Sequence, residues 1–202
     1  METVAVTGQV RESLGKKSSK AIRRQGMAPA VLYGAGEPTH FSIKPLDVRA
    51  LVYTPDFKLA DLTIGDTKIK AIIKDIQFHP VTDEIMHIDF LALQDGHPIK
   101  VNVPVSFEGN SPGVRAGGKL QQTVRKVSMK TTPDKLVDKI ILDISHLELG
   151  QAVRVRDIAP MEGVEILNPA GQPVASIEIP RALRSAATAA KKAEKEAGNE
   201  GE

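Results

Sequence analysis

The segment KDIQFHPVTDEIMHIDF, residues 74–90, contains two histidines, an amide and several acids in a pattern that could support chemistry. Along an extended chain successive side chains point to opposite faces, so the polar residues of each half would share a face opposite the apolar ones. If the two halves pair as strands with position 79 opposite 87, position 77 lies opposite 89. All four polar side chains then share one surface: Gln77, His79, His87 and Asp89.

Three interpretations of this surface are open. Two histidines and an aspartate are ordinary metal ligands, although no activated nucleophile or second ligand cluster accompanies them. The imidazoles could instead bond to the backbone in a purely structural patch. In the third interpretation Gln77 and the histidines contact base edges and ribose hydroxyls, and Asp89 accepts from an exocyclic amino group.

A basic segment favours the third interpretation. Residues 9–26 contain six cations and one acid, Glu12, whereas the whole chain has a net charge of only +2. A local cationic patch on a nearly neutral protein indicates a polyanionic partner, most simply nucleic acid. The alternative is a solvated, flexible basic loop. The six cations are Arg11, Lys16, Lys17, Lys20, Arg23 and Arg24.

Composition excludes several classes of protein. Cysteine is absent, which removes disulfides, thiolate catalysis and Cys-ligated metals and fits the cytoplasm. Aromatic residues make up only 3%, too few for a general single-strand binder that stacks successive bases. We expect no signal peptide and no membrane-spanning segment. No phosphate-binding loop and no catalytic set is recognisable, so we predict a non-enzymatic protein without a metal or cofactor.

The first half of the chain predicts strands and two short helices. Ser18 or Ser19 could cap a helix that stops at Gly26 and that presents Lys20, Arg23 and Arg24 on one side. A second helix is expected from Pro45. Residues 60–73 predict two strands around a Gly65-Asp66 turn. The apolar parity then changes near Lys74, which indicates either a bulge or a strand buried on both faces.

The second half predicts a β domain. Apolar residues alternate from Ile99 to Val105, further short strands follow, and a glycine-rich loop spans 108–118. We therefore expect a mainly β protein with a barrel-like N-terminal domain over 1–94, an all-β domain over 95–182 and a tail over 183–202. The tail is rich in Ala, Lys and Glu and predicts a frayed helix or disorder.

An ordered set of motifs resembles a known family. In chain order these are Arg11 with Gly15-Lys16, then AIRRQG, PAVLYG (29–34), IIKDIQFHPV (72–81), HIDF (87–90), VPVSFEG (103–109) and GVRAGGKL (113–120). Together they resemble the bacterial large-subunit ribosomal protein family numbered twenty-five, in the long two-domain form also called general stress protein Ctc. The resemblance spans about residues 3–180 and leaves the tail uncovered.

The resemblance implies binding of 5S ribosomal RNA by the N-terminal barrel, at an irregular internal loop, without catalysis. It implies phosphate contacts from the cations of the basic segment and more specific contacts from Tyr33, Gln77, His79, His87 and Asp89. It further implies contacts with other large-subunit components, and we expect a monomer away from the ribosome. The alternative function is a stress-induced protein-binding factor that works through the β domain; a hydrolase is a distant third.

Overall fold

The computed structural model describes residues 1–34 and 36–181, so the predicted tail lies outside the described residues. The chain forms two compact units, neither of which is contiguous in sequence. The first comprises Met1–Pro104, Ser128–Lys139 and Glu162–Ile166, and the second comprises the intervening segments and the described residues 167–181. A domain boundary near residues 94–96 remains a prediction.

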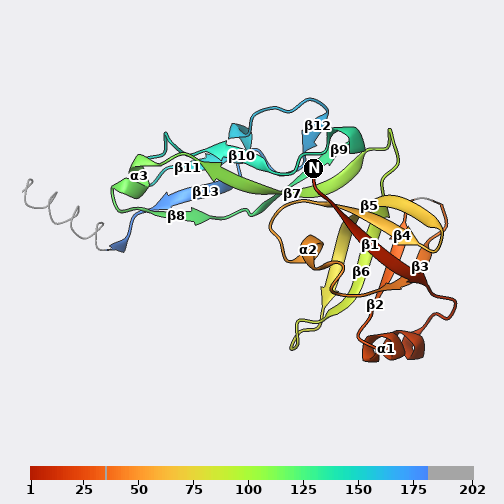
Figure 1. The fold of residues 1–202 in the computed structure, drawn as a ribbon. Coiled ribbons are helices and arrows are strands. Elements are labelled where there is room, and N and C mark those ends of the chain that lie inside the picture. Colours follow the sequence, from red (N-terminus) through yellow and green to blue (C-terminus); the bar gives the residue numbers. More distant parts are fainter. Residues whose placement is uncertain (35, 182–202) are drawn as a thin grey trace, which may run out of the picture. The chain divides into compact units, whose positions relative to one another are not determined.

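A closed six-stranded barrel dominates the first unit (Figure 1). The strand order is β1-β3-β2-β6-β5-β4, and parallel pairing of β1 with β4 closes the barrel, so these strands leave no open edge. The predicted mainly β fold with an N-terminal barrel is confirmed. The strands are β1 (Thr3–Val10), β2 (Ala28–Tyr33), β3 (Thr39–Ile43), β4 (Leu59–Ile64), β5 (Thr67–Phe78) and β6 (Ile85–Ala92).

The barrel interior is filled by the alternate residues of its strands. Along β4 every second side chain is buried, and on β6 Ile88 and Phe90 are fully buried, as their spacing predicts. The rings of Phe41 and Phe90 meet at the centre, with centroids 5.8 Å apart. Since Ile88 and Phe90 point inward, the residues between and beside them, His87 and Asp89, belong to the outer surface.

The turn and the bulge of the β4–β5–β6 meander match the sequence pattern. Gly65 begins the two-residue turn with φ +59°, and Ile64 pairs with Thr67 across it. The register of β5 against β6 shifts between Ile73 and Asp75, so the bulge interpretation of the parity change is confirmed. A second shift follows near the end of β5, between Gln77 and Phe78.

The two helices of the first unit differ from expectation in their bounds. Helix α1 (Lys16–Arg24) begins after Gly15 and has no side-chain cap, so the predicted Ser18 or Ser19 cap was wrong. Those hydroxyls instead accept hydrogen bonds from Arg11. The chain leaves the helix at Gly26, whose φ of +75° suits glycine. Helix α2 (Arg49–Val52) is shorter than predicted, because residues 45–48 form turns.

Two further sheets complete the fold, a four-stranded one of order β10-β7-β9-β12 and a three-stranded one of order β11-β13-β8. The second half is not purely β: Ser111 caps a short helix, α3 (Pro112–Arg115), within the predicted glycine-rich loop. The strand directly after it, β8, was not predicted. The strands are β7 (Ile99–Glu108), β8 (Lys119–Gln122), β9 (Lys126–Thr131), β10 (Ile140–Asp143), β11 (Ala152–Arg154), β12 (Val164–Ile166) and β13 (Pro173–Glu178); 3-10 turns lie at Pro133–Lys135 and Val155–Asp157.

Candidate RNA-binding surface

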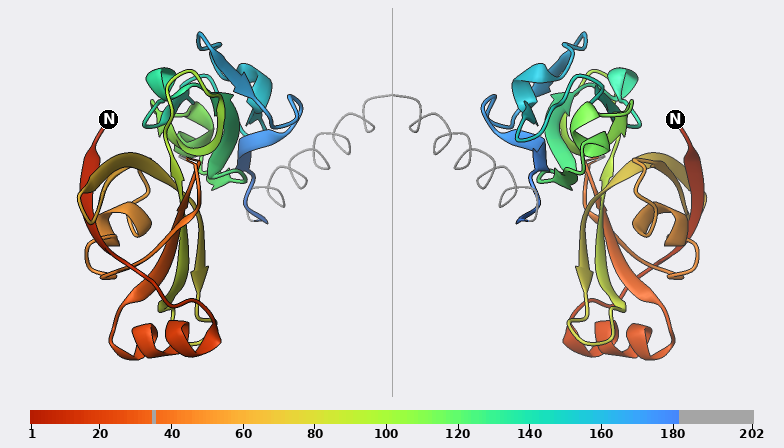
Figure 2. Two further views of the ribbon diagram at one scale, coloured as in Figure 1. Left: turned by 90° about the vertical axis from the view of Figure 1, so that its right-hand side faces the viewer. Right: turned by 90° about the vertical axis from the view of Figure 1, so that its left-hand side faces the viewer.

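Two arginines attach α1 to the barrel. The Nη2 of Arg11, which directly follows β1, donates to the hydroxyls of Ser18 and Ser19 at 3.4 and 3.2 Å. At the other end of the helix, the Nε of Arg23 donates to the carbonyl of Met86 on β6 at 3.1 Å. Both views of Figure 2 show α1 at the same end of the barrel as the β5–β6 hairpin. The helix therefore lies directly beside the strand that carries His87 and Asp89.

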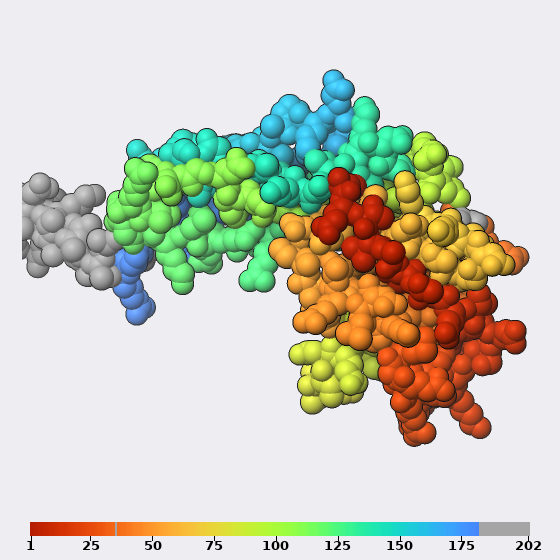
Figure 3. Space-filling model, viewed as in Figure 1, coloured from red at the N-terminus to blue at the C-terminus, as the bar shows by residue number. Residues whose placement is uncertain are grey.

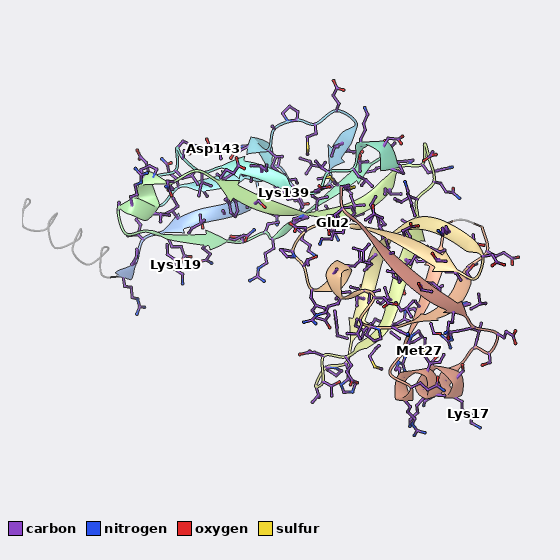
Figure 4. The ribbon with its side chains drawn as sticks, viewed as in Figure 1. Glu2, Lys17, Met27, Lys119, Lys139 and Asp143 are labelled. Atoms are coloured by element: carbon purple, nitrogen blue, oxygen red, sulfur yellow. The ribbon has the colours of Figure 1, made fainter. Side chains whose placement is uncertain are left out.

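The remaining cations of α1 are solvent-exposed. Lys16, Lys17, Lys20 and Arg24 all lie on the exposed side of a helix that contains no acid. Figure 4 shows the labelled Lys17 on the side of α1 away from the barrel, whereas Met27 lies where the chain returns to it. Lysines in the first turn oppose the helix dipole. Their placement therefore does not serve helix stability and is typical of a surface that receives anions.

The β5–β6 register differs from the one assumed from the sequence. Gln77, not His79, pairs with His87, and Asp75 pairs with Asp89. The assumed register was wrong by two residues, because the β-bulge and a short loop move the hairpin turn. Side chains alternate with a period of two, so a shift of two keeps Gln77, His87 and Asp89 on one face and adds Asp75 to it. Asp75 could have been predicted to lie on this face from the same alternation, because it is two residues before Gln77.

A strip of polar side chains results on the outside of β2, β5 and β6. The Nδ1 of His87 lies 2.7 Å from Oδ1 of Asp89, and both side chains are about one-third exposed. Tyr33 on β2 joins them, because β2 runs parallel to β6 with Val31 opposite Asp89. Burial raises the pKa of the Tyr33 phenol, and the negative charges of Asp89 and Asp75 raise that pKa further. The phenol thus remains a neutral hydrogen-bond donor beside two carboxylates.

The raised pKa of Tyr33 can be measured directly, because the chain has only one other tyrosine, Tyr53. In a Tyr53→Phe variant, we expect phenolate absorbance to appear at higher pH than for free tyrosine, which titrates near pH ~10. Replacing Asp89 with Asn in this background should lower the midpoint, since a repelling charge is removed. An unchanged midpoint would show that Asp89 does not act on the phenol.

The same shift links Tyr33 to stability. A folded-state pKa above the unfolded one contributes stability that is complete below about pH 10 and is lost as the pH rises through the folded-state pKa. Unfolding should therefore become easier in alkali, and less so in a Tyr33→Phe variant.

His79 has a structural task at the tip of the hairpin. Its Nδ1 accepts from the backbone N–H groups of Val81 and Thr82, at 3.3 and 3.2 Å, and the backbone N–H of His79 donates to the carbonyl of Glu84 at 2.8 Å. Of the three interpretations made from the sequence, backbone bonding therefore holds for this histidine. Only its Nε2 is left to act as an outward donor.

We expect His79→Ala to loosen the hairpin tip and His79→Asn to restore it, because an Asn side-chain oxygen can accept from the following backbone N–H groups. Amide hydrogen exchange at Val81 and Thr82 measures the effect: fast in the Ala variant, slow in the native and Asn chains. Equal protection in all three would assign the turn to the backbone alone.

The metal interpretation gains no support. Within residues 1–34 and 36–181, no group of three or more His, Asp and Glu side chains has the arrangement of a metal site. In the same part of the chain, no helix is long and apolar enough to cross a membrane.

The structure brings together two groups of predicted residues, the cations of α1 and the polar strip, with Arg23 between them and His79 set apart at the tip.

A closed β-barrel with a cationic helix beside a polar strand surface is typical of small proteins that bind a structured polyanion. Two family models match the chain. The Ribosomal L25p family covers residues 6–90, and the model for ribosomal protein TL5, C-terminal domain, covers residues 98–181.

Curated relatives match over nearly the whole length. A Large ribosomal subunit protein bL25 from Bacteroides thetaiotaomicron is 41% identical over 197 residues, which is 95% of this chain and all of the relative. Those of Porphyromonas gingivalis and Cytophaga hutchinsonii are 42% and 40% identical, over 93% and 95% of this chain and 98% and 100% of the relatives. The chain belongs to the bL25 family of large-subunit ribosomal proteins, in its two-domain form. The resemblance inferred from the motifs, to a family of ribosomal proteins rather than of enzymes, is confirmed.

Proposed function

We propose that the barrel of this cytoplasmic ribosomal protein binds 5S ribosomal RNA at an irregular internal loop. One observation carries the proposal: the hydrogen bond from Arg23 to the Met86 carbonyl holds the cationic helix against the strand that bears His87 and Asp89. Phosphate-binding charge and base-reading groups are thereby presented to the same ligand. The cations alone would explain only general RNA affinity, and the polar residues alone would be explained as a local structural network. Their placement side by side supports affinity together with selectivity.

Helix α1 supplies most of the affinity. Its exposed cations neutralise phosphates and release counterions, a contribution that is independent of sequence and falls as salt rises. Arg11 and Arg23 already have partners on the protein, so their main task is to fix the helix on the barrel. The exposed side chains of Lys16, Lys17, Lys20 and Arg24 reach the backbone of the RNA.

The polar strip supplies selectivity. Regular A-form RNA hides its base edges in a deep, narrow groove, whereas an irregular loop presents edges that side chains can reach. Asp89 and Asp75 would repel phosphates, so they favour RNA only where base amino groups donate to them. Tyr33 and Gln77 add donors at the same surface, and His87 holds the Asp89 carboxylate in place. Hydroxyl and amide groups of this kind also suit ribose 2′-hydroxyls.

Footprinting of the full-length protein on 5S ribosomal RNA tests the proposal. We expect backbone and base protection confined to an internal loop rich in non-Watson–Crick pairs, and weaker, salt-sensitive binding to a regular RNA duplex of equal length. Uniform protection along a stem, or no protection, would contradict it. The second unit contributes contacts to other large-subunit components in this proposal, and the free protein is a monomer.

A protein-binding stress factor is the alternative function. It predicts that 5S ribosomal RNA binds no more tightly than the control duplex, so the same experiment separates the two.

A further inference from the structure

Two exposed aromatic rings meet on the barrel at the end of β5. Tyr53, which follows α2, is 60% exposed and Phe78, at the end of β5, is 43% exposed. Their ring centroids are 6.5 Å apart, with the planes tilted by 56°. The whole chain has only seven aromatic residues, and Phe41 and Phe90 are fully buried. The contact between two of the few remaining rings, at the surface, is therefore not explained by the barrel core.

Two aliphatic side chains in the segments near these rings along the chain are also strongly exposed. Val81, in the loop after Phe78, is 84% exposed, and Leu46, before α2, is 76% exposed. In Figure 3 the hairpin tip, coloured yellow-green, projects next to the orange segment around α2 on the face in view. We call Tyr53, Phe78 and Val81, which lies three residues after Phe78, the aromatic patch. Grouped exposed apolar residues on a soluble protein indicate an interaction site.

The segments next to the two rings along the chain carry acids. Residues 50–57 and 79–84, which flank Tyr53 and Phe78, contain Asp56, Asp83 and Glu84 and no lysine or arginine. All three acids are exposed. The nearest cations along the chain are Arg49, in α2, and Lys58, which forms an ion pair with Glu2. This composition is the reverse of that of α1, which carries cations and no acid.

The charge decides the kind of partner. A single-stranded nucleic acid needs flat stacking platforms bordered by cations, and its phosphates would be repelled by Asp56, Asp83 and Glu84. A polypeptide that carries lysine or arginine beside an apolar side chain fits instead. Its cations can contact the carboxylates and the faces of the two rings, while its apolar side chain packs on Val81 and Phe78.

We propose that the aromatic patch binds a basic, partly apolar polypeptide segment of another large-subunit protein. The β5–β6 hairpin contacts α1 through Met86 and carries the patch through Phe78. The same hairpin therefore carries both the contact to α1 and one ring of the patch. The inference uses the membership in the large subunit and is independent of which RNA the barrel binds.

Photo-cross-linking within purified large subunits tests the partner. A benzoylphenylalanine placed at Val81 leaves the backbone N–H that bonds to His79 in place. We expect a cross-link to a protein, mapped to a peptide with lysine or arginine next to an apolar residue. A cross-link to RNA or to an acidic peptide, or no cross-link above that of the same probe at exposed Ile141, would overturn the proposal.

Charge reversal provides the second arm. Asp83→Lys with Glu84→Lys should lower the cross-link yield roughly fivefold, since each exposed charge contact changes affinity modestly. Reversing the exposed Asp66 in the β4–β5 turn should leave the yield unchanged, and equal yields in all three proteins would count against the proposal. Binding of 5S ribosomal RNA, measured in parallel with Tyr53→Ser/Phe78→Ser protein, should remain native, which separates this site from the RNA site.

Discussion

Full-length protein with Lys16, Lys17, Lys20 and Arg24 all changed to glutamine is expected to bind 5S ribosomal RNA roughly a thousandfold more weakly at 0.1 M salt, with a salt slope lower by about 3. Each of these exposed side chains should account for one phosphate contact, and each contact adds about 0.7–0.9 to the slope. Glutamine keeps nearly the helix propensity of lysine, so α1 should remain folded. Binding titrations over a series of salt concentrations measure both quantities.

A matched set of substitutions controls for total charge. Arg115, Lys119, Arg125 and Lys126 are exposed cations of the second unit, and changing all four to glutamine removes the same charge from the chain. This variant should keep nearly the native slope. If both variants lose the same slope, long-range charge rather than α1 governs binding, and the phosphate contacts assigned to the helix are wrong.

Asp89→Asn is expected to reduce the preference for the irregular loop over a regular duplex by about 1–3 kcal/mol, roughly five- to 150-fold. The affinity for the irregular loop and the affinity for the regular duplex should change in opposite directions. Loop binding weakens, because the amide is a poorer acceptor for a base amino group. Duplex binding strengthens slightly, because a charge that repels phosphate is gone. Parallel titrations with the two RNAs give both constants.

The neighbours of Asp89 sharpen this test. Because Nδ1 of His87 lies 2.7 Å from the carboxylate, His87→Ala and the double variant should show that the two effects on selectivity are not additive. Asp66→Asn, in an exposed turn, is the matched control and should change neither constant. If the loop-to-duplex ratio of Asp89→Asn equals the native one, Asp89 does not read the RNA, and the strip has only a structural role.

Local signals predicted the elements that frame the surface. The alternation of Ile88 and Phe90 with polar neighbours correctly put His87 and Asp89 on the outside, since the period of a strand is two. The parity change near Lys74 predicted the bulge. Gly65 and Gly26 marked a turn and a helix end, because each adopts a positive φ. Each of these features depends on residues that are only a few positions apart along the chain.

The differences come from side-chain contacts and register shifts that the residue pattern does not encode. The cap assigned to Ser18 or Ser19 failed because the helix begins at Lys16, which puts both serines inside it, where their hydroxyls accept from Arg11. The register assumed for the hairpin differs by two residues from the observed one, which has two shifts and a turn bonded to His79. The contact between Tyr53 and Phe78 joins residues 25 positions apart, and no local pattern announces it.

The amino-acid sequence by itself determined the strand faces, the basic segment and, through its ordered motifs, the family. Only the tertiary structure decided that the cationic helix lies against β6, because that position depends on a hydrogen bond between Arg23 and Met86, 63 residues apart, and on closure of the barrel. Charge and alternation are properties of short segments, whereas a shared surface requires the whole barrel to bring those segments together.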